Sequence, residues 1–182
     1  MKYASEDLIK EHEGILFGLK ILEKMVQLLK EKNQFQMDEL KEMINFLRLF
    51  ADKCHHGKEE GLLFPALENA GIPRENGPIE QMLLEHMEGR KYIAQMTELS
   101  ESTAFDKTAF IQSATNYIQL LRAHIDKENT ILFPLGDKRI PLEKQTELLE
   151  AFEEHEVKVM GIGTHEKLHA LLHRFKRKYL SK

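Results

Sequence analysis

Two segments far apart in the chain share one pattern of histidine, glutamate and a closing Leu-Phe-Pro. They are HHGKEEGLLFP at residues 55–65 and HIDKENTILFP at residues 124–134. In both, a glutamate follows the first histidine by four positions, which gives the pairs His55–Glu59 and His124–Glu128. Residues at i and i+4 share one face of a helix, so the members of each pair would point the same way. Imidazole and carboxylate together suit iron, manganese or zinc.

One further histidine precedes each segment. His12 follows Glu11 upstream of the first segment, and His86 follows Glu85 upstream of the second. Each half of the chain therefore pairs a helix that carries one histidine with a helix that carries His-x-x-x-Glu. This internal duplication of a helical hairpin predicts a bundle with a pseudo-twofold axis. We expect Glu11 and Glu85 to face outward or to orient neighbouring ligands.

The elements that must position these residues are helices, because apolar residues recur with helical spacing almost throughout. The pattern predicts helices over about residues 5–32, 38–64, 78–100 and 106–133, with Ser5 as the first N-cap and the fourth helix ending before Pro134. Residues 69–78 (NAGIPRENGP) have the composition of a loop. No segment favours a strand. The expected fold class is all-α, an up-down-up-down four-helix bundle.

The bundle is expected to occupy residues 1–136, and residues 137–182 to form a C-terminal helical extension packed on it within a single domain. An interruption of this extension is expected near residues 161–163 (GIG).

The apolar stripes place the four histidines and both glutamates toward the interior of the bundle. An alternative pair, His56–Glu60, has the same spacing, but polar Arg48 and Asp52 precede it on its face. Leu47 and Ala51 precede His55, so His55 and Glu59 are the pair expected to face the core. Burying ionised carboxylates without partners costs several kcal/mol or more, and two divalent cations would compensate that cost.

The combined pattern EH…HxxxEExxLFP…EH…HxxxENxxLFP resembles the hemerythrin-like, HHE cation-binding family over about residues 5–134. The resemblance implies a non-haem di-iron centre, oxo- or hydroxo-bridged, in which Glu59 and Glu128 bridge the irons. It implies terminal ligation by the four histidines, which are His12, His55, His86 and His124. Zinc or manganese would suit the same ligands. Members of the family bind, sense or buffer oxygen, nitric oxide or iron, and some repair iron–sulfur clusters.

One position departs from the oxygen-carrying members of that family. They have a second histidine one turn after the third-helix histidine, where this chain has Arg90. Simple reversible oxygen carriage is therefore in doubt. His56 is the candidate replacement and the seventh candidate ligand, although its phase on the helix favours a solvated or supporting position over a ligand.

The leading hypothesis is a small-molecule binding or sensing protein whose partner is a small diatomic ligand or iron. An enzyme at the same metals, such as a ferroxidase, a peroxidase or a nitric oxide-related or iron–sulfur repair activity, is the alternative. A ferritin-like protein would need Glu-x-x-His on two helices, and the one match is Glu166–His169. A metal-free helical interaction module would leave the duplicated pattern unexplained.

Composition narrows the other possibilities. Lys and Arg number 26 and Asp and Glu number 30, so the net charge of −4 argues against a nucleic-acid partner. No apolar run approaches the length of a membrane span, and the N-terminal residues have no signal-peptide pattern. The single cysteine, Cys54, favours a reducing compartment and reads as a small core-edge filler. We therefore expect a soluble, cytoplasmic protein.

A second group of histidines lies in the C-terminal region. His165, His169 and His173 are spaced by four residues, with His155 upstream. A second metal site is the less favoured interpretation, because no carboxylates from other helices accompany them. A helix that docks on the bundle is favoured.

Overall fold

The computed structural model describes residues 2–32, 35–161 and 163–180, except for the side chain of residue 165. The first bundle helix is α1 (Ala4–Lys32), and the third is α4 (Pro78–Glu101). The second runs without a break through α2 (Met37–Phe46), η1 (Leu47–His56), η2 (Glu59–Leu63) and α3 (Phe64–Asn69). The fourth runs through α5 (Lys107–Lys127), η3 (Glu128–Leu132) and α6 (Phe133–Arg139). Two more helices, α7 (Leu142–Met160) and α8 (Thr164–Phe175), precede a final turn, η4 (Lys176–Leu180).

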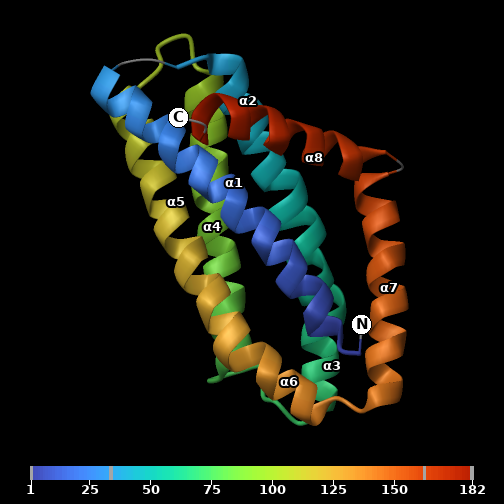
Figure 1. The fold of residues 1–182 in the computed structure, drawn as a ribbon. Helices are drawn as coiled ribbons and strands as arrows, with labels where there is room; N and C mark the ends of the chain where they lie inside the picture. Colours follow the sequence, from blue (N-terminus) through green and yellow to red (C-terminus); the bar gives the residue numbers. More distant parts are fainter. Residues whose placement is uncertain (1, 33–34, 162, 181–182) are drawn as a thin grey trace.

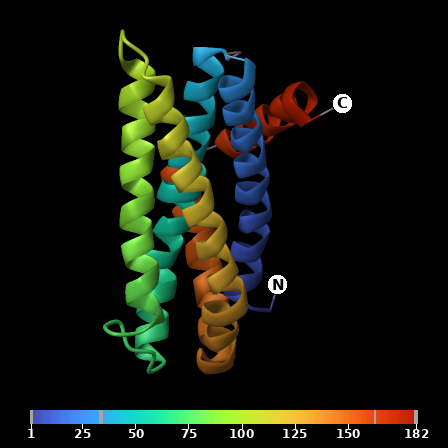
Figure 2. The ribbon, with the colours of Figure 1, turned by 90° about the vertical axis from the view of Figure 1, so that its left-hand side faces the viewer.

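These elements form the predicted all-α bundle, with no strand in the described ranges. The four bundle helices lie side by side, α7 packs along the outside and α8 crosses one end (Figures 1 and 2). No helix in the described part of the chain is long and apolar enough to cross a membrane.

Local sequence explains the starts of two helices. Asp106 caps α5 by accepting a hydrogen bond from the backbone N–H of Ala109, and Pro78 opens α4. Ser5 is not an N-cap, because α1 already begins at Ala4. Its hydroxyl instead donates to Asp137 at 2.7 Å, which ties the start of α1 to α6.

The prediction that the fourth helix ends before Pro134 is wrong, because α6 continues through this proline to Arg139. Proline lacks an N–H and crowds the carbonyl four residues earlier. A π-helical turn precedes the proline in both halves: the N–H of Phe133 donates to the carbonyl of Glu128, five residues back, and Phe64 donates to Glu59 in the same way. We attribute the passage of the helix to this wider turn, which relieves the crowding.

The hydrophobic core falls into two clusters with a polar layer between them. On α1, Leu8 belongs to one cluster and Ile15 to the other, and His12 lies between them in sequence. On α4, Met82 and Ile93 are divided in the same manner around His86. The polar layer thus crosses the bundle at one level.

The C-terminal helices pack on the bundle by extending these clusters. Phe152 of α7 joins one cluster, and Leu168 and Phe175 of α8 join the other. Helix α7 ends at Met160, and the positive φ angles of Gly161 and Gly163 (74° and 80°) turn the chain into α8, where an interruption was expected. Residue 162 lies outside the described residues.

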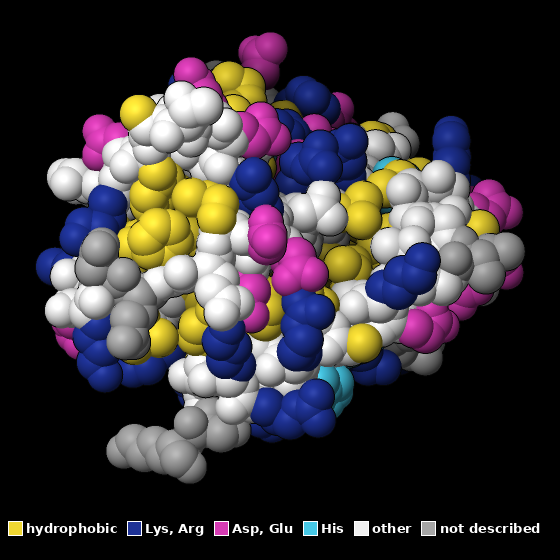
Figure 3. Space-filling view, turned by 90° about the horizontal axis from the view of Figure 1, so that it is seen from above, with side chains coloured by type: hydrophobic (Ala, Val, Ile, Leu, Met, Phe, Trp, Pro, Cys, Tyr) yellow, Lys and Arg dark blue, Asp and Glu magenta, His cyan; other side chains and the backbone are white. Residues whose placement is uncertain are grey.

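The end of the molecule nearest α8, seen from above, carries basic, acidic and hydrophobic side chains side by side (Figure 3). Arg174 and Lys178 in this C-terminal segment pair with Glu42 and Glu39 of α2. His169 and His173 are exposed on α8, and no group of candidate metal ligands among the described residues includes them. The side chain of His165 lies outside the described residues.

Candidate metal centre

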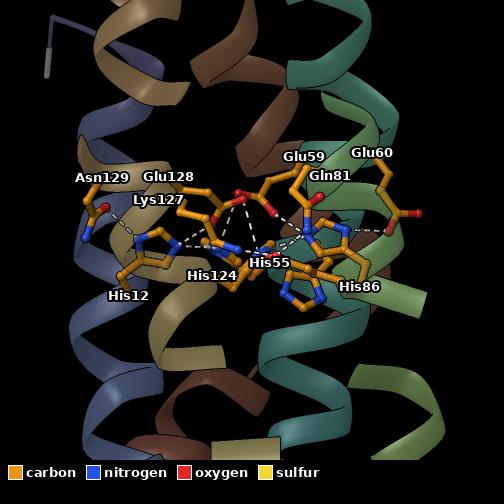
Figure 4. A network of polar contacts seen from close by, with 12 residues as sticks. His12, His55, Glu59, Glu60, Gln81, His86, His124, Lys127, Glu128 and Asn129 are labelled. Atoms are coloured by element: carbon orange, nitrogen blue, oxygen red, sulfur yellow. Dashed lines mark hydrogen bonds and ion pairs between the residues drawn. The ribbon is translucent and has the colours of Figure 1, made fainter. Parts of the chain in front are cut away.

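The structure brings the four predicted histidines together at the polar layer, each from a different bundle helix (Figure 4). All are about 1% exposed. The Nε2 atoms of His12 and His55 lie 2.9 Å apart, and those of His86 and His124 lie 3.1 Å apart. The imidazoles therefore form two pairs whose Nε2 atoms face the interior.

Each of the two predicted glutamates reaches one histidine of each pair. The carboxylate oxygens of Glu59 lie 3.5 Å from Nε2 of His55 and 3.3 Å from Nε2 of His86. Those of Glu128 lie 3.2 Å from Nε2 of His12 and 3.2 Å from Nε2 of His124. Each carboxylate therefore links the two pairs, as a bridging ligand would.

Both glutamates are fully buried, and none of their four carboxylate oxygens has a hydrogen-bond partner in the described structure. Burial and the neighbouring Glu128 raise the pKa of Glu59 to about 7. Burial acts in the same direction on Glu128, but the imidazoles of His124 and His12 outweigh it and hold the pKa of Glu128 well below its ordinary value. Buried oxygens without donors, on adjacent like charges, fit a site for cations.

The electrostatics of His124 point the same way, whereas burial lowers the pKa values of His55 and His86. Burial lowers the pKa of His124, but the Glu128 carboxylate outweighs that effect and raises the pKa to about 10. The interior between these side chains therefore favours positive charge, which a metal ion would supply in place of protons.

The outer nitrogen of every imidazole in the two pairs faces an oxygen acceptor. Nδ1 of His55 lies 2.8 Å from Glu11, and Nδ1 of His124 lies 3.0 Å from Glu85. Of the two roles expected for Glu11 and Glu85, facing outward or orienting neighbouring ligands, the contacts match the second. When Nδ1–H donates to a carboxylate, the lone pair of the ring lies on Nε2, where a metal would bind.

The other two acceptors were not singled out from the sequence. Nδ1 of His86 lies 2.7 Å from Glu60, and Nδ1 of His12 lies 2.8 Å from Oδ1 of Asn129. Glu60 and Asn129 hold the same place in the repeat, directly after Glu59 and Glu128. Their equivalent places in the two repeats were the signal in the sequence that could have identified them as acceptors. At this position the first half has Glu after Glu59, and the second half has Asn after Glu128.

The phenylalanines of the Leu-Phe-Pro motifs cover the imidazoles. Phe133 stacks on His12 with ring centroids 5.5 Å apart and planes 8° apart. Phe64 stacks on His86 at 5.9 Å and 18°. In both cases the phenylalanine and the imidazole come from opposite halves of the chain. The motif therefore supplies the apolar wall that keeps water away from these rings.

His56 is not solvated, contrary to the phase of its helix. It is 3% exposed, its ring stacks on that of His86 at 3.8 Å, and neither ring nitrogen has a hydrogen-bond partner within the described residues. The π-helical geometry of η1 lets two successive residues, His55 and His56, both face the interior. Burial and the neighbouring His86 lower the pKa of His56 to about 4, so its ring is neutral near pH 7.

Arg90 occupies the position at which oxygen-carrying relatives have a histidine. It donates to Asp52 and to Glu60, both at 2.7 Å. Burial alone would raise the pKa of Glu60, but His86 and Arg90 lower it to about 2. Arg90 therefore holds a charged acceptor against His86 and a second carboxylate, Asp52, beside His56.

Two overlapping groups of side chains have ligand atoms close enough to share an ion. His12, His55, Glu59 and Glu128 form what we call the first group. His56, Glu59, His86 and His124 form the second group, which Glu128 also reaches through His124. Within each group, one ligand atom per residue lies within 4.8 Å of the others.

A helical bundle with paired imidazoles and bridging carboxylates at mid-height defines a class of metal-binding bundle proteins. Within that class, the chain belongs to the hemerythrin HHE cation-binding domain family, whose model matches residues 4–136. Helices α7 and α8 lie outside the matched segment.

Three curated proteins that are similar to this chain are described as uncharacterized proteins. One from Mycobacterium bovis and two from strains of Mycobacterium tuberculosis are each 26% identical to this chain over 162 residues, which cover 87% of it. The chain spans 63% of the length of these relatives. No solved structure gives a significant match.

Proposed function

We propose that this protein holds two metal ions, most naturally a di-iron centre, and uses them to bind or sense a small diatomic ligand or to buffer iron. The first group would hold one ion and the second group the other, with Glu59 and Glu128 bridging. The observation that carries this proposal is that each buried carboxylate reaches a histidine of both pairs while its oxygens lack hydrogen-bond donors.

The donor set favours iron, with zinc or manganese as alternatives. Imidazole and carboxylate suit these metals, whereas copper(I) and iron–sulfur clusters prefer thiolate. The thiol of Cys54 belongs to neither group. An iron pair, when bound, would supply the redox chemistry that reaction with oxygen, peroxide or nitric oxide requires.

The two groups differ in nitrogen donors. The second group has three imidazoles, from His56, His86 and His124, and the first has two, from His12 and His55. We therefore propose that His56 takes the role of the histidine that Arg90 replaces. The first group would then be the less saturated one, and an external ligand is expected there.

The chain's own residues would protect and orient the centre. Phe64 and Phe133 exclude water from one side, and the Nδ1 acceptors hold each imidazole with Nε2 inward. Dry surroundings strengthen the interaction between the carboxylates and the cations.

The test is metal analysis of purified protein combined with optical spectra under anaerobic conditions and after addition of oxygen or nitric oxide. We expect about two irons per chain, an absorption typical of a ferric pair, and a spectral change with one of these ligands. The Glu128→Ala variant should lose the pair. A protein that is fully folded but binds no more iron than Glu128→Ala would overturn the proposal.

The same preparation separates binding from catalysis. Stable saturation of the spectral change would favour a binding or sensing role. Sustained consumption of peroxide or oxygen, well above that of free iron, would favour an enzyme.

A further inference from the structure

Lys58 directly precedes Glu59, and Lys127 directly precedes Glu128. Each lysine contacts a different glutamate, the one that accepts a hydrogen bond from a histidine of the two pairs. Lys58 Nζ lies 2.7 Å from one oxygen of Glu11, whose other oxygen lies 2.8 Å from Nδ1 of His55. Lys127 contacts Glu85, which accepts from His124, in the same way. The repeat therefore contains two Lys–Glu–His chains that end on candidate ligands.

The two chains differ in their surroundings. The side chain of Lys58 is 1% exposed, whereas that of Lys127 is 36% exposed. Helix α7 causes the difference, because its Phe152 ring lies 5.6 Å from the Lys58 ammonium and its Glu156 lies 3.3 Å from it. The Lys127 ammonium is open to water, which could take its place as a donor.

A second difference concerns the residue five positions before the first histidine of each half. In the second half this residue is Gln81, which donates to Glu85 at 2.7 Å. In the first half it is Asp7, which accepts from Lys58 at 3.2 Å and cannot donate to Glu11. Apart from His55, Lys58 is thus the one side-chain donor to Glu11 in the described structure.

Lys58 also contacts a nearby cluster of candidate metal ligands. Glu11, Cys54 and Glu156 lie close enough to share a metal ion, but the ammonium of Lys58 already contacts both carboxylates. The charge of the cluster is therefore compensated by the chain itself.

We propose that Lys58 is a positioning residue for the first group, which fixes Glu11 and through it His55, and that α7 of the C-terminal extension holds Lys58 in place. This inference rests on the proposed two-metal function. It gives the extension a role at the metal centre, because Lys58 lies between the extension and one of the two groups.

The experiment is a titration of the full-length, metal-stripped protein with Co²⁺, read by the visible absorption of each bound ion. The wild type should bind two ions. Lys58→Met should lower the affinity for one of them by about tenfold or more and change its spectrum, because loss of a residue that orients a ligand typically has an effect of that size. Lys58→Arg should restore both properties.

The matched control is Lys127→Met, which removes the counterpart lysine. It should change either affinity by less than about threefold, because Gln81 and water remain as donors to Glu85. Glu156→Gln removes the α7 carboxylate that contacts Lys58, so it should lower the same affinity, by less than Lys58→Met does, and leave the other nearly unchanged.

Several results would overturn the inference. They are wild-type affinities and spectra for both ions in Lys58→Met, tighter binding in that variant, or an equal loss in Lys127→Met. Circular dichroism of each metal-stripped variant establishes whether it is folded. If Lys58→Met is not folded, Lys58→Arg is measured in its place, and wild-type binding is again expected. A wild-type protein that binds no pair of ions would instead contradict the proposed function itself.

Discussion

At the scale of single residues, the site is built from charges that the fold makes unfavourable without cations. Glu59 and Glu128 meet in a dry interior, and each has only imidazoles within reach of its oxygens. His56 adds a neutral ring with no hydrogen-bond partner among the described residues. Side chains of this kind weaken the metal-free fold, so their cost is measurable when metal is absent.

In the metal-free protein, the raised pKa of Glu59 should contribute a loss of stability as the pH rises from about 4.5 to 7. The pKa of Glu59 is raised from 4.5 to about 7 in the fold, so the folded state binds a proton that the unfolded chain releases in this interval. This contribution to the unfolding free energy should fall by up to roughly 3 kcal/mol over the interval, whereas the lowered pKa values of the buried His55 and His56 act in the opposite direction. Urea unfolding of chelator-treated protein at several pH values measures this.

The control for this pH dependence is Glu59→Gln, which has no proton to release at that position. The stability of the wild type relative to this variant should therefore fall as the pH rises over the same interval. An identical pH profile in variant and wild type would assign the dependence to other groups.

His56→Ile copies into the first repeat the residue that stands in the second, Ile125. We expect affinity for one of two Zn²⁺ ions to fall at least about tenfold, because the second group loses a nitrogen donor. The metal-free variant should be as stable as the wild type or more so, since an unpartnered buried ring is replaced by an apolar one. Calorimetric zinc titration and thermal melting test both parts, and unaltered binding of two ions would remove His56 from the ligand set.

At the scale of elements, a glycine allows two bundle helices to pack closely. Gly18 of α1 packs on Phe46 of α2, and a Cβ at Gly18 would lie 2.5 Å from the buried ring. Gly61 of η2 has no neighbour within 4 Å of such a Cβ. The two glycines therefore offer the same substitution with and without a steric consequence.

Gly18→Ala should destabilise the protein by about 1–3 kcal/mol, because the methyl group overpacks the contact between α1 and α2. Gly61→Ala should be neutral or stabilise by up to about 1 kcal/mol through its better helix propensity. Chemical unfolding of the two variants side by side provides the measurement. Equal effects at the two positions would show that packing at Gly18 does not set the distance between these helices.

The sequence predicted the helices and six convergent side chains well, because a repeat and an i, i+4 spacing are both visible in one dimension. It did not predict the burial of His56 or the continuation of α6 through Pro134. Both depend on π-helical turns, in which the backbone selects a partner five residues away instead of four. That choice depends on packing around the turn, which residue spacing alone does not encode.

At the scale of the whole molecule, the polar layer of candidate ligands separates two hydrophobic clusters and draws on all four bundle helices. Helix α7 extends both clusters, and α8 extends one of them. The stability of the chain should therefore depend on the ions as well as on apolar packing.

Removing the metal should lower the melting temperature by about 5–10 °C, because ions that bind only the folded state stabilise it by mass action. Thermal scans of loaded and chelator-treated protein at equal concentration measure the shift. The Glu128→Ala variant should show little further loss on chelation. A melting temperature that does not respond to chelation in the wild type would contradict coupling between the layer and the fold.

The exchange of supporting groups between the two halves has a consequence for the origin of the chain. His12 and His86 each take their Nδ1 acceptor and their covering phenyl ring from the opposite hairpin. An isolated hairpin would consequently need a second copy of itself to complete the arrangement, and such a homodimer would be bound to two equivalent ions. In such a homodimer, every substitution would appear in both copies at once. Joining both copies in one polypeptide lifts that constraint, because each half can then change alone. Three pairs of equivalent positions differ in this way: His56 and Ile125, Asp7 and Gln81, and Glu60 and Asn129.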